Sequence, residues 1–481
     1  MPSSDAANKN IETNSALAFA RARKARDARF DGVFFIAVKT TGIYCRPVCP
    51  ANPPLERNVE YHQSALSAAE AGFRPCLRCR PESAPRSPAW RGTETTLKRA
   101  IDLIQTGALN DSKLSNLAER LGISDRYLRD LFRRNLGVSP KRYATYQQCM
   151  FAKQLLHNSN LPINEIAFSS GFNSVRRFND VMRQYLSLTP SQIRKDSSRA
   201  NEGLSFLLNY RPPFAWSEML AFLKRRVINN LEWSTDDSYG RTIRHDQGVG
   251  YFEVRNEAEH SRLRLTLEFD RPESYSAIHY RLRHVFDVDV DIQCVDSHLQ
   301  NELEREAKRA QLDEPIVALQ YLRGLRIPGI WGLFEAGVRA ILGQQVSVVA
   351  AQNLVQTLLT EFGEDLPSRP NSKLFPLPSA VLNSSLDFFK MPQSRKDTVH
   401  RLAQHFIDSS NPSDIDAWMD IKGIGPWTVN YVKLRGSKDP DIWLAGDAGL
   451  KNALMKVGNL EQLERFAPWR SYLTFQLWNQ L

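Results

Sequence analysis

The segment from residue 45 to residue 79 contains four of the six cysteines of this chain, arranged as Cys45-Arg-Pro-Val-Cys49 and Cys76-Leu-Arg-Cys79. Two close pairs joined by a longer loop supply the four thiolates that a tetrahedral Zn²⁺ requires. Six cysteines in 481 residues are too few for a disulfide framework, so the clustering indicates a metal site in a reducing compartment. The spacing therefore predicts a small zinc domain. By itself the spacing favours a metal that only folds this domain over one that also serves chemistry.

The two halves of the chain differ in charge. Residues 1–92 carry a net charge of +6 and residues 93–195 one of +8, whereas residues 196–481 carry −4. A basic half joined to a slightly acidic half indicates a polyanion-binding part attached to a part with another task. The longest uncharged run, from Ala340 to Thr360, contains several Gln and Asn side chains. It predicts a buried helix and not a membrane span.

Two polar stretches, residues 81–88 and 195–203, are expected to be linkers because they lack apolar periodicity. Beyond the second one, Arg262–Phe269 alternates strictly and predicts a half-buried strand. Helical patterns dominate from about residue 296 onward. We therefore predict a multidomain fold, part α+β and part all-α, in which each part except the zinc domain is large enough for its own core. The predicted domains are 1–85, 93–195, 204–290 and 296–481.

The middle domain contains an internal repeat. Leu117-Ala-Glu-Arg-Leu-Gly-Ile-Ser124 is echoed by Ile166-Ala-Phe-Ser-Ser-Gly-Phe-Asn173. Each copy has a short amphipathic helix, a turn at glycine and a second, Arg-rich helix, which predicts two helix-turn-helix units. We expect the second helices at about residues 124–134 and 173–184. Some of their arginines could be solvated surface; the candidates for contacts with DNA phosphates and bases are Arg126, Arg129, Arg133, Arg176, Arg177 and Arg183.

The run Ile421-Lys-Gly-Ile-Gly-Pro-Trp-Thr428 lies between two helical patterns. Gly423 and Gly425 allow a tight hairpin, and free N–H groups at the start of the next helix can bind phosphate. The plain alternative is a helix–helix turn. Asp447 follows in a loop, where a helix cap and a catalytic carboxylate are both open.

Residues 28–82 resemble the N-terminal domain of the adaptive-response (Ada) regulator, over the runs Phe34–Pro50 and Ala71–Glu82. The resemblance implies stoichiometric methyl transfer from a DNA phosphotriester to a zinc-bound cysteine, which maps to Cys45. Zn²⁺ with four thiolates carries a net charge of −2, and methylation of one sulfur leaves −1. That change lowers the repulsion from the DNA backbone, so the transfer can also switch DNA affinity.

The internal repeat resembles the AraC/XylS family of transcription regulators, whose signature matches Phe178–Pro190. The resemblance implies that the second helix of each unit is a recognition helix for the major groove of DNA.

Residues 204–481 resemble the AlkA-type 3-methyladenine DNA glycosylases of the helix-hairpin-helix superfamily. The matching runs are Leu208–Phe214, Gly337–Ser347, Ile421–Thr428 and Pro468–Tyr472. The resemblance implies a TBP-like α+β subdomain followed by a helix-hairpin-helix domain, with Asp447 as the catalytic aspartate. One carboxylate suffices because an alkylated purine is already a cationic leaving group, and the carboxylate stabilises the charge that develops on the sugar.

The same resemblance assigns four aromatic side chains to the base pocket, although core packing is an equal alternative for each: Phe222, Trp427, Tyr431 and Trp478. Trp427 stands where strand-cutting relatives place a nucleophilic lysine, so we expect a monofunctional enzyme that leaves an abasic site. Gln345 stands where the best-known family member has a leucine wedge.

Together these features predict a DNA alkylation-damage response protein that accepts a methyl group, activates transcription and excises alkylated purines such as 3-methyladenine. Its expected partners are alkylated and promoter double-stranded DNA, with RNA polymerase as a further candidate and no membrane. Its expected location is the bacterial cytoplasm, in association with the nucleoid. Two alternatives stay open: a transcription regulator whose C-terminal half only clamps DNA, and a glycosylase whose N-terminal half only tethers it.

Overall fold

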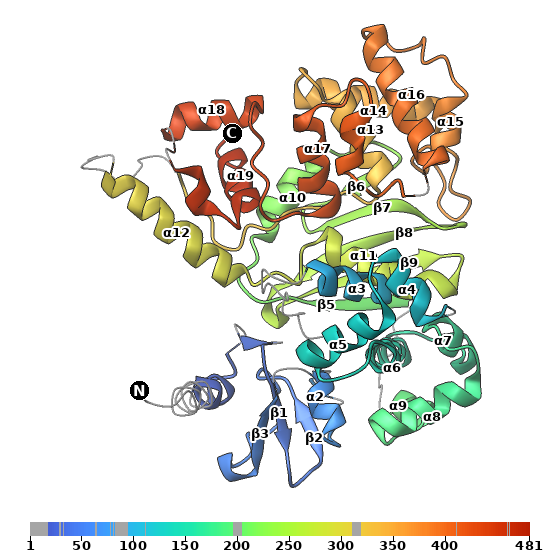
Figure 1. The fold of residues 1–481 in the computed structure, drawn as a ribbon, viewed down its shortest axis with the longest axis vertical. Helices are drawn as coiled ribbons and strands as arrows, with labels where there is room; N and C mark the ends of the chain where they lie inside the picture. The colour runs from blue at the N-terminus through green and yellow to red at the C-terminus, as the bar shows by residue number, and fades with distance from the viewer. Residues whose placement is uncertain are drawn as a thin grey trace.

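A computed structural model describes most of the chain: residues 18–27, 30–31, 33–62, 65–76, 78–79, 81, 95–110, 112–195, 204–309, 319–409, 411–458, 460 and 462–481. Apart from Pro81 and Lys195, both predicted linkers lie outside the described residues. We call the described residues from 18 to 81 the cysteine domain, those from 95 to 195 the repeat domain, and those from 204 to 481 the C-terminal half. Figure 1 shows the repeat domain between the other two parts.

The cysteine domain is built on a four-stranded sheet in the order β3-β1-β2-β4, in which β2 and β4 are parallel and the other pairs antiparallel. Its elements are β1 (Phe35–Val38), β2 (Ile43–Cys45), β3 (Val59–His62), α2 (Ala65–Glu70) and β4 (Arg74–Pro75). Successive residues of β1 enter two separate apolar clusters, one around Tyr44 and one around Phe34. Because both clusters are small, this domain needs a further source of stability.

The repeat domain contains two pairs of short helices joined by a long one. Its helices are α3 (Thr95–Gln105), α4 (Leu114–Arg120), α5 (Asp125–Leu136), α6 (Pro140–Asn158), α7 (Ile163–Ser169), α8 (Val175–Leu186) and α9 (Pro190–Lys195). The turns of the two pairs contain Gly122 at φ 67° and Gly171 at φ 80°. The side chains of Ser124 and Ser174 then cap α5 and α8. Both second helices end two residues beyond the predicted positions.

Helix α6 contacts both neighbouring parts. The hydroxyl groups of Tyr146 on α6 and Tyr44 on β2 are 2.7 Å apart. On the other side, the ring of Phe151 lies 5.9 Å from that of Phe206 in the C-terminal half. A continuous cluster of buried apolar side chains runs from α3 through α6 into the C-terminal sheet. The core of the repeat domain is therefore continuous with that of the C-terminal half, because the apolar face of α6 is completed by the sheet.

The C-terminal half begins with an antiparallel sheet in the order β5-β9-β8-β7-β6. The strands are β5 (Leu204–Asn209), β6 (Glu232–Ser234), β7 (Ser238–His245), β8 (Gly248–Glu257) and β9 (Arg262–Phe269). Strand β9 occupies the predicted residues, and its burial alternates as the pattern requires. The helices that accompany the sheet are α10 (Trp216–Lys224), α11 (Tyr275–Val285) and α12 (Ile292–Arg309).

The rest of the C-terminal half is helical, and its helices lie beyond the sheet in Figure 1. They are α13 (Leu333–Leu342), α14 (Val348–Phe362), α15 (Pro378–Leu382), α16 (Gln393–Asp408), α17 (Pro426–Val432), α18 (Ala448–Val457) and α19 (Arg470–Trp478). The single buried helix predicted over residues 340–360 is wrong. The Ser347 side chain caps α14 by accepting from the N–H of Ala350, so a new helix starts there. Val349 at the start of α14 is 64% exposed. Within the described residues, no helix is both long and apolar enough to cross a membrane.

We predict that Phe151→Ala lowers the free energy of unfolding by about 3 kcal/mol, because it opens a cavity where α6 meets the sheet. The matched control is Phe168→Ala, since Phe168 is 51% exposed on α7. That change is expected to cost less than about 0.5 kcal/mol. Urea denaturation followed by tryptophan fluorescence measures both. Equal losses in the two variants would contradict the shared core.

Candidate functional site

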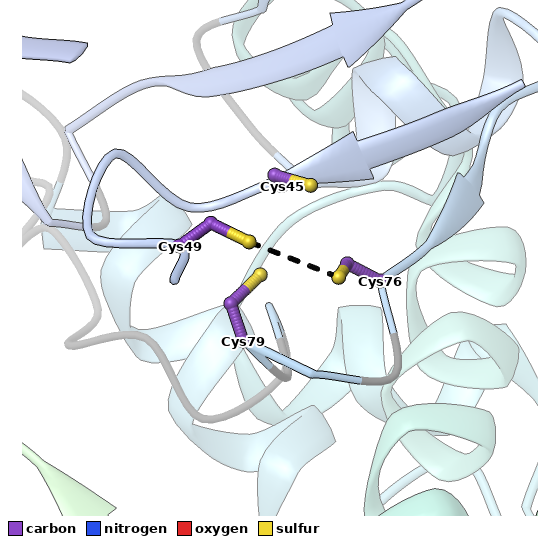
Figure 2. Close-up of side chains that lie close together, drawn as sticks. All are labelled: Cys45, Cys49, Cys76 and Cys79. Atoms are coloured by element: carbon purple, nitrogen blue, oxygen red, sulfur yellow. Dashed lines mark hydrogen bonds between the residues drawn. The ribbon is translucent and has the colours of Figure 1, made fainter. Parts of the chain in front are cut away.

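The four cysteines of the predicted zinc site meet at one end of the cysteine-domain sheet. Parallel pairing of β2 with β4 brings Cys45, the last residue of β2, beside Cys76, which follows β4. Cys49 and Cys79 come from the loops after these strands. All four Sγ atoms lie within 4.8 Å of one another, and those of Cys49 and Cys76 are 4.0 Å apart. Figure 2 shows the side chains gathered around one point.

This donor set fits Zn²⁺. A tetrahedral ion with Zn–S bonds of about 2.3 Å separates its sulfurs by roughly 3.8 Å, close to the separations found. Without a cation, the four thiols do not ionise together: hydrogen bonding with neighbouring sulfurs lowers the pKa of Cys49 and of Cys76, but not those of the other two. Hydrogen bonding with Cys49 and Cys76 raises the pKa of the Cys45 thiol, and burial raises the pKa of Cys79. A divalent cation reverses this effect and holds all four as thiolates.

The four sulfurs are not equivalent. The side chain of Cys45 is half-buried, whereas Cys49 and Cys79 are only 9% and 7% exposed. The backbone N–H of Arg46 donates to Sγ of Cys79 at 3.3 Å, and that of Ala51 donates to Cys49. Among the described residues, no backbone N–H donates to Sγ of Cys45. Cys45 is therefore the most exposed of the four residues, and it lacks the N–H donors that Cys49 and Cys79 have.

The predicted DNA-contacting arginines of the repeat domain are all exposed. Those of the first unit lie on α5 and those of the second on α8: Arg126, Arg129, Arg133, Arg176, Arg177 and Arg183. The apolar faces of the same helices, including Leu128 and Phe178, are buried in the domain core. Each helix therefore presents a cationic face to solvent, as phosphate contacts require.

A cavity of about 1140 Å³ is lined by residues of the C-terminal helices and of strands β6 and β7. It brings together most of the C-terminal residues singled out from the sequence; Gly423 lies outside its lining. Those that line it are Phe222, Gln345, Gly425, Trp427, Tyr431, Asp447 and Trp478.

The Asp447 carboxylate is fixed by three N–H donors. Nε1 of Trp427 donates to Oδ2 at 3.2 Å, and Nε1 of Trp478 donates to Oδ1 at 3.0 Å. The backbone N–H of Leu450 also donates to Oδ1, at 2.8 Å, so Asp447 is the N-cap of α18. The predicted cap is therefore present. It leaves the carboxylate in the cavity wall, with two aromatic side chains that set its orientation.

Two arginine side chains lie over one of the aromatic rings that line the cavity. Trp427 and Tyr431 stack with ring centroids 5.4 Å apart. Over the Phe222 ring, however, the guanidinium of Arg226 lies at 3.7 Å and that of Arg435 at 4.8 Å. Burial, together with the charge of Arg435, lowers the pKa of Arg226 to about 10. Sequence analysis missed both arginines, although Arg226 lies one helical turn beyond Phe222, a spacing that could have indicated it.

The glycine hairpin borders this cavity. Gly423 has φ 100°, and a Cβ atom there would lie 1.9 Å from Oγ1 of Thr398 on α16. Only glycine fits this position. Gly425 is the N-cap residue of α17, which Pro426 begins. Gln345 also lines the cavity and is exposed at φ 57°, in the turn between α13 and α14.

Three domain families match this chain. Residues 18–82 match the metal binding domain of Ada, residues 117–196 a helix-turn-helix domain, and residues 205–332 the AlkA N-terminal domain. This combination defines a class of protein that joins an Ada-type metal site to an AlkA-type part through a DNA-binding helical region.

Several curated relatives share these parts. The chain is 34% identical to a probable bifunctional transcriptional activator/DNA repair enzyme AlkA of Mycobacterium tuberculosis, over 96% of this chain and 95% of the relative. It is 30% identical to DNA-3-methyladenine glycosylase 2 of Escherichia coli, over 57% of this chain and 96% of that protein. A solved structure of Escherichia coli Ada in complex with DNA is 34% identical over 28% of this chain and 92% of its own, with a TM-score of 0.14.

The protein belongs to the family of bifunctional transcriptional activators and DNA repair enzymes of the Ada-AlkA type. Its cluster of four cysteines is the metal centre of the Ada part and is consistent with Zn²⁺.

We predict that the purified protein contains one Zn²⁺ per chain and that Cys76→Ser lowers this content strongly, because three thiolates hold the ion less tightly than four. Cys294→Ser is the matched control, since Cys294 is exposed and far from the cluster in sequence. Elemental analysis of the three proteins measures the zinc. Full zinc content in Cys76→Ser would exclude Cys76 as a ligand.

Proposed function

We propose that this protein accepts a methyl group from a DNA methylphosphotriester on Cys45, activates transcription, and excises alkylated purines such as 3-methyladenine. The observation that carries the proposal is the presence, in one chain, of a cluster of four thiols in which Cys45 is the most exposed residue and of a large cavity with Asp447 in its wall. The domain limits that go with it are 1–85, 93–195, 204–290 and 296–481.

In the methyl transfer, Sγ of Cys45 donates an electron pair to the methyl carbon, and the C–O bond of the triester breaks. The bonding electrons stay on the phosphate oxygen, which becomes a phosphodiester anion. Zn²⁺, when bound by the four cysteines, supplies the positive charge that keeps Cys45 ionised without a separate base. Cys45 then carries a neutral thioether, so the cluster becomes less negative and repels DNA less.

In base excision, the N-glycosidic bond breaks heterolytically, and the cationic alkylated base leaves with the bonding electrons as a neutral purine. Water then adds to the sugar carbon that lost the base and releases one proton to solvent. Asp447 supports this step because its negative charge offsets the positive charge that develops on the deoxyribose. The two indole N–H groups hold both carboxylate oxygens in place before the reaction. Trp427, Tyr431 and Trp478 offer aromatic surface to a flipped base, while the Phe222 ring is already covered by guanidinium. Because Trp427 is not a nucleophile, we propose a monofunctional enzyme that leaves an abasic site.

DNA is held by several surfaces in this proposal. The arginines of α5 and α8 act as the recognition surface of a double helix-turn-helix for promoter DNA. The hairpin with Gly423 and Gly425 binds backbone phosphate as part of a helix-hairpin-helix domain, next to a TBP-like subdomain, and Gln345 fills the gap left by the flipped base. RNA polymerase is a further proposed partner. A reducing bacterial cytoplasm, near the nucleoid, suits a cluster that works as thiolates.

We predict that wild-type protein incubated with DNA containing methylphosphotriesters gains one methyl group on Cys45, and that Cys45→Ser gains none. Intact mass and peptide mapping measure the gain, with Cys294→Ser as the control that still accepts. A methyl group on another cysteine, or none on wild-type protein that contains zinc, would make the cluster structural.

We predict that Asp447→Asn lowers single-turnover excision of 3-methyladenine by a factor of about 10²–10³, because the amide caps α18 but lacks the negative charge. Asp441→Asn is the matched control, since Asp441 lies in the same loop but pairs with Arg470 outside the cavity lining. If neither wild type nor variant excises the base, the C-terminal half is only a DNA clamp. Equal activity in wild type and Asp447→Asn would remove Asp447 from catalysis.

A further inference from the structure

The C-terminal half reaches the cysteine domain through one buried arginine. The side chain of Arg211, in the loop after β5, is fully buried, and its Nε donates to the carbonyl oxygen of Asp31 at 2.8 Å. These two residues are 180 positions apart in the chain. A guanidinium excluded from water keeps such a contact because breaking it would leave a buried donor unsatisfied.

Residues of the C-terminal half also hold Arg211 in place. Its Nη1 pairs with Oδ2 of Asp291 at 2.9 Å, just before α12. Its backbone carbonyl accepts from the guanidinium of Arg326, whose Nη1 donates to the carbonyl of Asp287 at 2.6 Å. The position of Arg211 is therefore set by the core of the C-terminal half and not by the cysteine domain.

On the other side of the contact, Asp31 binds an arginine of the metal centre. Both carboxylate oxygens of Asp31 accept from Arg46, and the two side chains are only 3% and 7% exposed. A bidentate pair of this kind fixes the orientation of both partners. The backbone carbonyl of Asp31 anchors the pair to Arg211, because the same residue makes both contacts.

Arg46 in turn sets the geometry of the cysteine cluster. It follows Cys45 directly in the chain. Its backbone N–H donates to Sγ of Cys79 at 3.3 Å, and its Nη1 donates to the carbonyl of Cys79 at 3.0 Å. The orientation of Arg46 thus decides where the sulfur of Cys79 and the peptide after Cys45 lie.

We propose that Arg211 is a positioning residue for the methyl-acceptor centre: the C-terminal half, through Arg211, Asp31 and Arg46, holds the cysteine cluster in the geometry that it needs. The inference rests on the proposed methyl transfer for its functional meaning. Its structural content, that a residue of the C-terminal half controls retention of the metal, can be measured separately.

The test uses full-length protein with Arg211→Met, which removes the N–H donors at similar volume, and Arg211→Lys, which keeps a cation that can reach one partner. The matched control is Arg283→Met. Arg283 is a buried arginine of the same half, on α11, that pairs with Asp289. Among the described residues, it makes no hydrogen bond or ion pair with the cysteine domain. Three properties are measured: the rate of zinc release to the chromogenic chelator pyridylazoresorcinol, the rate of single-turnover methyl transfer from methylphosphotriester DNA, and stability by thermal unfolding.

We expect Arg211→Met to release zinc about tenfold faster than wild type, as the loss of a buried charged hydrogen bond implies, and to accept the methyl group more slowly. The zinc-release and methyl-transfer rates of Arg211→Lys should lie between those of wild type and Arg211→Met. If Arg211→Met does not fold, Arg211→Lys alone tests the proposal. Arg283→Met should lose stability but release zinc at the wild-type rate.

Zinc release at the wild-type rate in both Arg211 variants would overturn the proposal. So would equally fast release in Arg283→Met, because the effect would then be general destabilisation. If wild type accepts no methyl group, the proposed function fails, while the zinc-release comparison still decides the role of Arg211. If wild type accepts the methyl group and both Arg211 variants match it in both rates, only the role of Arg211 fails.

Discussion

The burial of helix α6 is the constraint on which the arrangement of this protein depends. Most of the side chains between Pro140 and Asn158 are buried, including Lys153, whose Nζ donates to the carbonyl oxygen of Cys76 at 3.2 Å. Tyr146 contacts the cysteine domain through Tyr44, and Phe151 packs against the C-terminal sheet. Because α6 is buried on most faces by other elements, it holds the metal centre and the sheet on opposite sides.

The two chemical centres use charge in opposite ways. Four neighbouring sulfurs are stable as thiolates only around a cation, so the cysteine cluster stores negative charge that methylation partly removes. The cavity of the C-terminal half instead places the carboxylates of Asp447, Glu232 and Glu335 among cations such as Arg226 and Arg435. Figure 1 shows the repeat domain between the cysteine domain and the helices of the C-terminal half.

Local sequence patterns predicted most of the local structure. They failed where a helix N-cap starts a new helix inside a run of uniformly uncharged composition. The alternation of Arg262–Phe269 predicted strand β9, and the repeated Gly turn predicted the helix pairs around α5 and α8. The uncharged run from Ala340 to Thr360 predicted one buried helix, yet Ser347 starts a second helix inside it. The absence of charge over a long run indicates only that the run can be buried. A helix cap depends on a single hydrogen bond between one hydroxyl group and one N–H, and an average over many residues does not reveal it.

The sequence by itself determined the zinc ligands, the helix pairs, the strand pattern and the position of Asp447, because each depends on spacing along the chain or on a family motif. Only the tertiary structure decided that two indoles orient Asp447, that guanidinium covers Phe222, and that Arg211 supports the metal centre through Asp31. These contacts join residues far apart in the chain, and their formation depends on how packed helices and strands bring the side chains together. The spacing of residues along the chain does not predict such contacts, because the burial and orientation of each side chain are set only when the core packs.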